Sequence, residues 1–415
     1  MDPVITPAVV AFVLGKILAD ATNQRPAPAP MALDVPELTV VAVGGSGAGK
    51  TVLLSSMFHE LSLPTMNRCY FLDTDLGTRN RLSQTYGDVA HPHRAWPVAT
   101  DRKSFALTFD CTTWIDEAKA VAFKLNYWEY SGGFIDGSIG NSDESRALDQ
   151  RISDADAVFG ILDGRRVLQY LRDESDGRDY MEAIIQPMLG KIGATIQPRR
   201  PVYFVLTKWD VFNEYGGPEL RDENTRLAHV ANRLVRTAGI GRILNTHPVR
   251  LIPVSSVGPD FAQLGPSGTT TKNPRGNCRP ERVDVPLSAI IPDLIDQLAP
   301  FPDPRNEADP RTLGDLPGQA ANWLAGETGR AGRDAFDSSI GMRVVGGESI
   351  SFMLGKLGGK ARERERQRIQ WRAEADARAM RNHRARAAIL ADFRKTTARL
   401  EATLPASLLS EGGRS

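Results

Sequence analysis

Short apolar runs rich in valine and leucine recur along the first three hundred residues, and most are followed by a stretch whose apolar positions have helical spacing. Runs of this length without alternation are typical of strands buried on both faces of a sheet. The strands expected on this basis are 38–43, 157–162, 202–206 and 249–254, the last being the final strand. The expected helices are 50–61, 165–172, 178–192, 219–238 and 287–298.

A different pattern occupies residues 104–127, where single apolar residues alternate with polar or small ones. Phe105, Leu107 and Phe109 alternate in this way, and after a polar turn Phe123 and Leu125 do the same. Two alternating runs with a short connection indicate an antiparallel hairpin. The whole pattern predicts an α/β fold: a doubly wound, mostly parallel sheet with one antiparallel edge hairpin.

The remaining segments follow neither pattern. Residues 64–100 read as irregular, with helical pieces limited by Pro92 and Pro97. The expected organisation is a domain flanked by four other parts: 1–33, an apolar helix with a Pro/Ala linker; 34–300, the domain; 301–358, an irregular linker; 359–403, a long basic helix; 404–415, a tail.

Bulk composition narrows the class of protein only slightly. The 415 residues have a formal net charge of +1 and are 41% hydrophobic, so they can bury a large core, and overall charge indicates no acidic partner. The three cysteines are far apart and form no C-x-x-C pair. A disulfide framework or a zinc site is therefore not expected, and a reducing cytoplasm is the expected compartment.

Two terminal segments leave alternatives open. Residues 4–19 are apolar but too short to span a membrane and lack the basic leader of a secretory signal, so we expect a helix packed on the domain, with peripheral membrane contact as the alternative.

The basic helix at 359–403 is expected to be solvated. The alternative is that its arginines face a protein partner, nucleic acid or an anionic membrane. Nucleic acid is the least favoured, because the helix shows no pattern of aromatic residues for base stacking beyond Trp371.

The strand at 38–43 runs into a glycine-rich turn that opens the next helix. This stretch fits G-x-x-x-x-G-K-[ST] at every fixed position. Backbone N–H groups of such a turn and the helix dipole favour phosphate, the lysine supplies a point charge, and the hydroxyl is placed to ligand Mg²⁺. The predicted phosphate-binding residues are Gly44, Gly45, Ser46, Gly47, Ala48, Gly49, Lys50 and Thr51, with Thr51 also a metal ligand.

The end of the strand at 202–206 carries Thr207-Lys208-Trp209-Asp210, which resembles the [NT]-K-x-D pattern of GTPases. A carboxylate at 210 accepts hydrogen bonds from N1 and N2 of guanine, whereas adenine offers an acceptor at N1 and leaves the charge unpaired. One strand later, Ser255 and Ser256 resemble the loop that offers a backbone N–H to guanine O6. The predicted base-binding residues are Thr207, Lys208, Asp210, Ser255 and Ser256.

The end of the hairpin resembles the GTPase switch motif D-x-x-G with one departure. Glu129 takes the aspartate's place and is predicted to hold Mg²⁺, while Gly132 is predicted to meet the γ-phosphate. Gly133 stands where Ras-like enzymes have the glutamine that orients the attacking water. Slow intrinsic hydrolysis is therefore expected, and the residue that orients the water stays unknown.

The segment before the hairpin should contain the other switch. Thr100 is predicted to contact Mg²⁺ and the γ-phosphate, in preference to Thr74 or Thr78, which lie farther from the hairpin. An arginine that stabilises the transition state of GTP hydrolysis could come from this segment of the same chain or from a partner protein. The candidates in cis are Arg79, Arg94 and Arg102.

The order of these motifs resembles the translation-factor-related (TRAFAC) class of P-loop GTPases over residues 38–298, and the glutamate switch resembles bacterial double-GTPase and conflict-system members. The resemblance implies a P-loop fold, GTP or GDP with Mg²⁺ as cofactors, slow GTP hydrolysis, and a two-state switch read by a protein effector. Two other functions remain open: an ATP-using ATPase or kinase, and a structural GTP-binding scaffold with little hydrolysis.

Overall fold

The computed structural model describes residues 35–97, 104–130, 132–134, 142–237, 240–264, 270–298 and 348–411. The expectations for residues 1–33 and for residues 301–347 of the linker lie outside them, whereas residues 348–358, which were expected to be irregular, are helical. Contacts divide the chain into two units, one with residues 1–34 and 342–379 and the other with residues 35–341 and 380–415. Within the first unit, the described residues are the first part of a helix, and the fold below is that of the second unit.

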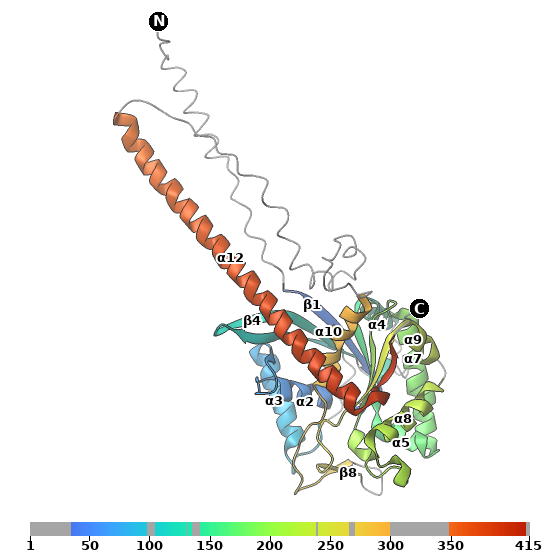
Figure 1. Cartoon of the computed structure of the whole chain (residues 1–415). Helices are drawn as coiled ribbons and strands as arrows, with labels where there is room; N and C mark the ends of the chain where they lie inside the picture. Colours follow the sequence, from blue (N-terminus) through green and yellow to red (C-terminus); the bar gives the residue numbers. More distant parts are fainter. Residues whose placement is uncertain are drawn as a thin grey trace. The chain divides into compact units, whose positions relative to one another are not determined.

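Eight strands form one sheet in the order β10-β7-β6-β5-β1-β4-β3-β2, and a separate two-stranded hairpin pairs β8 with β9 (Figure 1). The strands are β1 Glu37–Gly44, β2 Tyr70–Asp73, β3 Phe105–Ile115, β4 Ala118–Glu129, β5 Ala157–Asp163, β6 Val202–Thr207, β7 Pro248–Pro253, β8 Ala262–Leu264, β9 Thr270–Lys272 and β10 Leu408–Glu411.

Helices connect most of these strands. They are α2 Lys50–Leu61, α3 Leu76–Ala90, α4 Ser142–Asp154, α5 Gly164–Leu171, α6 Ser175–Tyr180, a π-helical turn Met181–Ile185, α7 Gln186–Thr195, α8 Glu223–Val235, α9 Ile240–Thr246, α10 Val285–Leu298 and α12 Glu348–Thr403. Short 3-10 turns lie at Gly132–Phe134, Trp209–Phe212, Pro218–Leu220 and Pro405–Ser407.

The predicted fold class is confirmed. Strands β4, β1, β5, β6 and β7 are parallel neighbours, as expected for a doubly wound P-loop NTPase sheet, and β3 pairs with β4 as the antiparallel hairpin. The strands at 38–43, 157–162, 202–206 and 249–254 all form. The buried strands read as continuous apolar runs because helices cover both faces.

Side-chain contacts show which helices cover each face. On one face Phe109 contacts Phe58 of α2, and Tyr203 donates a 2.8 Å hydrogen bond to Asp293 of α10. On the other face Trp128 of β4 packs against Arg151 of α4, whose guanidinium carbon lies 3.9 Å from the ring centroid. Figure 1 shows α2 and α3 beside the antiparallel end of the sheet, and α7, α8 and α9 beside the other end.

Two expectations from the pattern were wrong. Residues 64–100 are not irregular throughout, because the unpredicted strand β2 pairs with β3. Helix α3 is one of the helical pieces allowed in this stretch and ends before Pro92; Asp75 caps it, and the Asp75 carboxylate accepts the amide hydrogen of Thr78. The short β2 is fixed by its partner strand, and α3 buries only Leu82 and Val89, so neither leaves a strong periodic signal. The strand at β7 is also not the last, because β8, β9 and β10 follow it.

Two long predicted helices are shorter or interrupted. The stretch 178–192 is divided between α6, the π-helical turn and α7, where Pro187 stands in the first turn of α7. The stretch 219–238 begins with a 3-10 turn. Helix α8 itself starts after Asp222, whose carboxylate caps it by accepting a 2.7 Å hydrogen bond from the Thr225 amide. Local capping and proline geometry, rather than hydrophobic spacing, set these boundaries.

Candidate functional site

The predicted phosphate loop links the buried end of β1 to the start of α2. Gly47 and Gly49 have φ angles of +73° and +89°, in the left-handed region where a side chain is strained. These two residues turn the chain so that α2 starts at Lys50 with its N-terminus facing the loop. Such an N-terminus, with its backbone N–H groups and positive dipole end, is suited to an anion.

The ammonium group of Lys50 lies over this loop. Its Nζ donates hydrogen bonds to the carbonyl oxygens of Gly44 at 2.9 Å and Gly45 at 3.0 Å. The side chain is buried, and this burial lowers its pKa, while the nearby Glu129 carboxylate acts in the opposite direction. A positive charge is therefore held inside the turn rather than in solvent.

Glu129 ends β4 in register with Ala42 of β1, directly beside the phosphate loop. Its Oε1 accepts a 2.9 Å hydrogen bond from the hydroxyl of Thr51, and within the described part of the chain its buried Oε2 has no hydrogen-bond partner. Burial raises the pKa of Glu129, and the charge of Lys50 opposes that rise. An unsatisfied buried carboxylate oxygen beside a threonine hydroxyl fits a hard cation such as Mg²⁺, which takes oxygen ligands.

Gly132 follows on the other side of the loop. A Cβ atom at this position would stand 2.1 Å from the backbone nitrogen of Ser46 and 2.6 Å from the carbonyl carbon of Gly45. Only glycine allows the chain after β4 to approach the phosphate loop so closely. The next residue, Gly133, is buried in the same short turn.

Thr207 and Lys208 connect the end of β6 to the phosphate loop. The Thr207 hydroxyl donates to the carbonyl oxygens of Ala48 at 2.7 Å and Leu162 at 3.0 Å. Lys208 has a left-handed φ of 54°, and its Nζ donates to the Gly47 carbonyl at 3.0 Å and to Asp163 at 2.7 Å. Asp163, at the end of β5, was not among the predicted residues; no sequence motif marks it.

Asp210 lies one turn farther on, in the 3-10 turn Trp209–Phe212. Its Oδ1 accepts a 2.5 Å hydrogen bond from the Ser255 hydroxyl, and Ser255 Oγ in turn accepts the amide hydrogen of Gly258 at 2.9 Å. Burial raises the pKa of Asp210, and the bond from Ser255 opposes the rise. Ser255 is fully buried and orients this carboxylate, whereas Ser256 lines the cavity.

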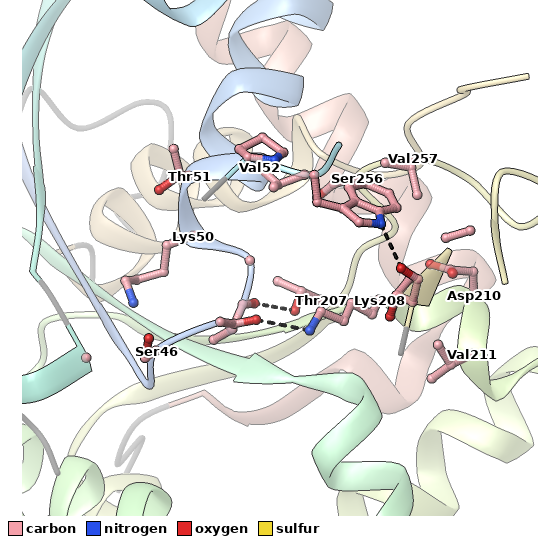
Figure 2. Close-up of a pocket in the computed structure, with 18 of the residues that line it drawn as sticks. Ser46, Lys50, Thr51, Val52, Thr207, Lys208, Asp210, Val211, Ser256 and Val257 are labelled. Carbon is pink, nitrogen blue, oxygen red and sulfur yellow. Dashed lines mark hydrogen bonds between the residues drawn. The ribbon is translucent and has the colours of Figure 1, made fainter. Parts of the chain in front are cut away.

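These groups share one cavity of about 270 Å³ (Figure 2). Lys50, Thr51 and Glu129 line one part of its wall, and Lys208, Asp210 and Ser256 line another. Residues outside every predicted motif also line it: Trp96, Pro97, Val257, Ala262, Gln263 and Thr270. Trp96 and Pro97 come from the stretch 64–100, which reads as irregular, and the others follow Ser256, where no prediction was made.

The other predicted residues divide into three groups. Thr100 and Arg102 lie outside the described residues. Arg79 and Arg94 are in ion pairs with Asp73 and Asp88, respectively. The Thr74 hydroxyl donates a 2.8 Å hydrogen bond to the Thr108 carbonyl of β3, and the Thr78 amide donates to Asp75 at the start of α3.

Arg81, which was not predicted, faces the site more directly. Its guanidinium carbon lies 5.2 Å from the ring centroid of Phe105, the residue paired with Glu129 across β3 and β4. Residues directly opposite in an antiparallel pair point to the same face. The Arg81 charge thus stands on the face that carries Glu129, and it is one of the charges that oppose the rise of the Glu129 pKa.

The described residues contain neither a membrane-spanning helix nor a metal-binding cluster of side chains. None of the helices in the described ranges is long and apolar enough to cross a membrane. No group of three or more His, Cys, Asp and Glu side chains in those ranges could hold a metal ion alone. The latter finding is compatible with Mg²⁺ at Thr51 and Glu129, since Mg²⁺ is usually held by one or two protein oxygens together with substrate phosphates.

Comparisons with known proteins give little beyond this geometry. No family model and no curated protein sequence matches the chain. Among solved structures, the chain is similar to the signal recognition particle receptor SRb-GTP/SRX complex from Chaetomium thermophilum, with a TM-score of 0.29 and 16% identity over 53% of this chain and 91% of that one. A similarity this weak supports no conclusion about function, so the interpretation of the cavity rests on the topology and side chains of this chain.

Proposed function

We propose that this protein binds GTP with Mg²⁺ in the cavity between the phosphate loop and Asp210, and hydrolyses it slowly to GDP as a regulatory switch. The observation that carries the proposal is that Lys50 and Asp210 line the same cavity. These residues are 160 positions apart in the sequence, and each has a distinct chemical preference: an ammonium for phosphate and a carboxylate for the donor edge of guanine.

The surroundings of Asp210 support guanine rather than adenine. The Ser255 hydroxyl fixes Oδ1 at 2.5 Å, so the carboxylate is oriented before a base arrives. Guanine supplies two N–H donors to a carboxylate in this position, whereas adenine supplies none at N1. A buried carboxylate facing an acceptor would lose its solvation without compensation, which strongly disfavours ATP.

The part of the cavity lined by the phosphate loop and Glu129 fits a triphosphate with a bound Mg²⁺. Thr51 and Glu129 would hold the ion, Glu129 through its unsatisfied Oε2 or a water, and the metal would neutralise charge on the phosphates. Lys50 contacts the phosphates as a point charge. Gly132 lies against Ser46 so closely that its backbone can report whether the terminal phosphate is present.

Slow hydrolysis follows from Gly133, which has no side chain to orient a water molecule. The output would be read by a protein effector, through the segment after β4 and the segment before β3. Membership of the TRAFAC class, a place near bacterial double-GTPase or conflict-system proteins, and a cytoplasmic location belong to the same proposal. Peripheral membrane contact through residues 4–19 is the alternative to their packing on the domain.

The decisive experiment measures GTP and ATP affinity by calorimetry for wild type and Asp210→Asn. We expect wild type to prefer GTP. The asparagine amide replaces one of the two acceptor oxygens, which the N1–H and N2–H groups of guanine need, with an NH₂ donor. The variant should therefore lose GTP affinity by roughly ten- to hundredfold and gain affinity for xanthosine triphosphate. Asp179→Asn, an exposed aspartate on α6, is the matched control and should bind like wild type.

Lys50→Ala adds a second arm to this experiment. It removes the phosphate contact without altering the base contact, so it should weaken GTP and xanthosine triphosphate equally. Equal affinity of wild type for GTP and ATP would favour an ATPase or kinase and overturn the guanine assignment. So would an Asp210→Asn variant with unchanged affinities.

A second candidate, a structural GTP-binding scaffold, is favoured by Gly133 alone. Single-turnover hydrolysis with Mg²⁺ distinguishes the two functions. A switch converts bound GTP to GDP within the experiment or when a partner is added, whereas a scaffold keeps GTP intact under both conditions.

A further inference from the structure

The hairpin β8–β9 follows directly after the Ser255 loop and precedes α10, a position that none of the predicted motifs uses. Ala262, Gln263 and Thr270 of this hairpin line the cavity. The hairpin base is fixed by Asn273, whose amide donates to the Phe261 carbonyl at 2.8 Å and whose side chain donates to the Asp260 carbonyl at 3.0 Å. The hairpin is thus an ordered part of the cavity wall at the end that holds Asp210 and Ser256.

Trp96, from the segment before β3, contacts this hairpin directly. Its indole Nε1 donates a 2.9 Å hydrogen bond to the Thr270 carbonyl, one of the dashed lines in Figure 2. Its ring stands edge-on to Phe261, with centroids 6.4 Å apart, and Lys272 Nζ lies 4.7 Å from its centroid. A side chain from the segment before β3 is therefore held by residues that follow the base-binding loop.

Lys272, at the end of β9, also links the hairpin to the segment before β3. Its Nζ donates to the carbonyl oxygens of Asp88 and His91, at the end of α3, the latter at 3.1 Å. Val89 packs with Val257 and Phe261 in a small apolar cluster separate from the main core. Lys272 does not line the cavity itself, so it acts on Trp96 and on the end of α3.

We propose that Trp96 packs against the nucleoside of the bound nucleotide, and that the β8–β9 hairpin and Lys272 hold it there as a clasp. The proposal rests on the proposed function, since it needs a nucleotide in this cavity. An indole in a wall shared with Asp210, Val257 and Ser256 offers a flat apolar surface to a purine or its ribose. The hydrogen bond from Nε1 to Thr270 uses the indole's only donor and fixes the ring orientation.

The clasp has a kinetic consequence. Nucleotide cannot leave past Trp96 unless the indole moves, and movement breaks the Thr270 hydrogen bond and the Lys272 contacts together. Release of GDP should therefore be slow, and the segment that carries Trp96 links the nucleoside end of the cavity to the chain that enters β3. A partner that pulls this segment away from the hairpin would accelerate exchange.

The test measures release of tritiated GDP from preloaded full-length protein by filter binding, with excess unlabelled GDP as the chase. Trp96→Ala should release GDP roughly ten- to hundredfold faster, the range expected when base–aromatic packing is lost. Lys272→Met removes the fastening but no atom of the cavity wall, and should accelerate release severalfold. The matched controls are Trp114→Ala and Lys395→Met, both exposed in the structure, which should release GDP like wild type.

The outcomes separate the two proposals. Should wild type bind no guanine nucleotide, the proposed function and the clasp are both wrong. When wild type binds GDP but Trp96→Ala and Lys272→Met release it at the wild-type rate, the clasp alone is wrong. Circular dichroism shows whether Trp96→Ala folds; if it does not, Lys272→Met, which leaves the cavity intact, decides.

Discussion

Glu129 has the environment of a ligand rather than of a structural ion pair. One of its oxygens is bonded to Thr51, and the other is buried without a hydrogen-bond partner in the part of the chain that the structure describes. A buried, incompletely satisfied carboxylate is unfavourable for folding, and a cation bound at its free oxygen would compensate for that cost.

Removing this charge tests the metal assignment. In Glu129→Gln, the increase in GTP affinity that Mg²⁺ brings over EDTA should shrink by roughly ten- to hundredfold, because the amide is a weaker metal ligand than a carboxylate. Affinity in EDTA should change little. Calorimetry with and without Mg²⁺ gives both values. The exposed Glu144→Gln is the control, and an unchanged Mg²⁺ effect in Glu129→Gln would remove this residue from the metal site.

The end of α12 and strand β10 show how a C-terminal segment becomes part of the domain. Phe393 is fully buried, edge-on to Tyr70 of β2 with centroids 4.8 Å apart and near Phe123 of β4 at 6.1 Å. The carboxylate of Asp392 accepts a 2.6 Å hydrogen bond from the Cys69 amide. This helix segment therefore covers the antiparallel side of the sheet, next to the strands that lead to Glu129.

Truncating Phe393 measures how much that cover contributes. Phe393→Ala leaves a cavity between two aromatic rings and should lower the free energy of unfolding by about 3 to 5 kcal/mol. Met380→Ala, on the same helix but half exposed, should change it by less than about 0.5 kcal/mol. Urea denaturation followed by circular dichroism gives both numbers. Similar small effects for the two variants would show that this part of α12 is not docked in solution.

The domain takes residues from distant parts of the chain, and an ion cluster joins them, in which Arg250 and Asp293 are buried and Glu401 is partly exposed. Arg250 of β7 pairs with Asp293 of α10 at 2.6 Å and with Glu401 of α12 at 2.8 Å. These bonds raise the pKa of Arg250 although burial acts against them. Beyond this cluster, β10 adds an antiparallel edge to β7, so the sheet is completed by residues 408–411.

Ending the chain after residue 379 should therefore harm the whole domain. The truncation exposes the apolar surface under Phe393, frees the edge of β7 and removes Glu401 from Arg250. We expect a lower thermal unfolding midpoint, by differential scanning calorimetry, and a smaller soluble fraction. Removing only residues 412–415 is the control and should be neutral. A domain ending at 379 with the midpoint of the full chain would show that the C-terminal segment is dispensable for folding.

Much of the fold could be predicted from the sequence because it depends on local patterns. Apolar runs located β1, β5, β6 and β7, and alternation located β3 and β4. Helix α2 spans the predicted residues, since its start is set by the glycines of the phosphate loop. Elements that depend on pairing with a distant partner, β2 and β10, left no signal, because four-residue strands carry too few positions for a pattern.

For the site, the sequence by itself determined which groups are present: the phosphate loop with its lysine and threonine, a carboxylate after β6 and a glutamate at the end of β4. Only the tertiary structure decided that Lys50 and Asp210 share a cavity, that Ser255 orients the Asp210 carboxylate rather than lining the cavity, and that Trp96 and the β8–β9 hairpin also line it. The physical reason is that motifs encode backbone geometry within a few residues. A cavity wall is instead assembled from side chains whose proximity exists only after the sheet has formed.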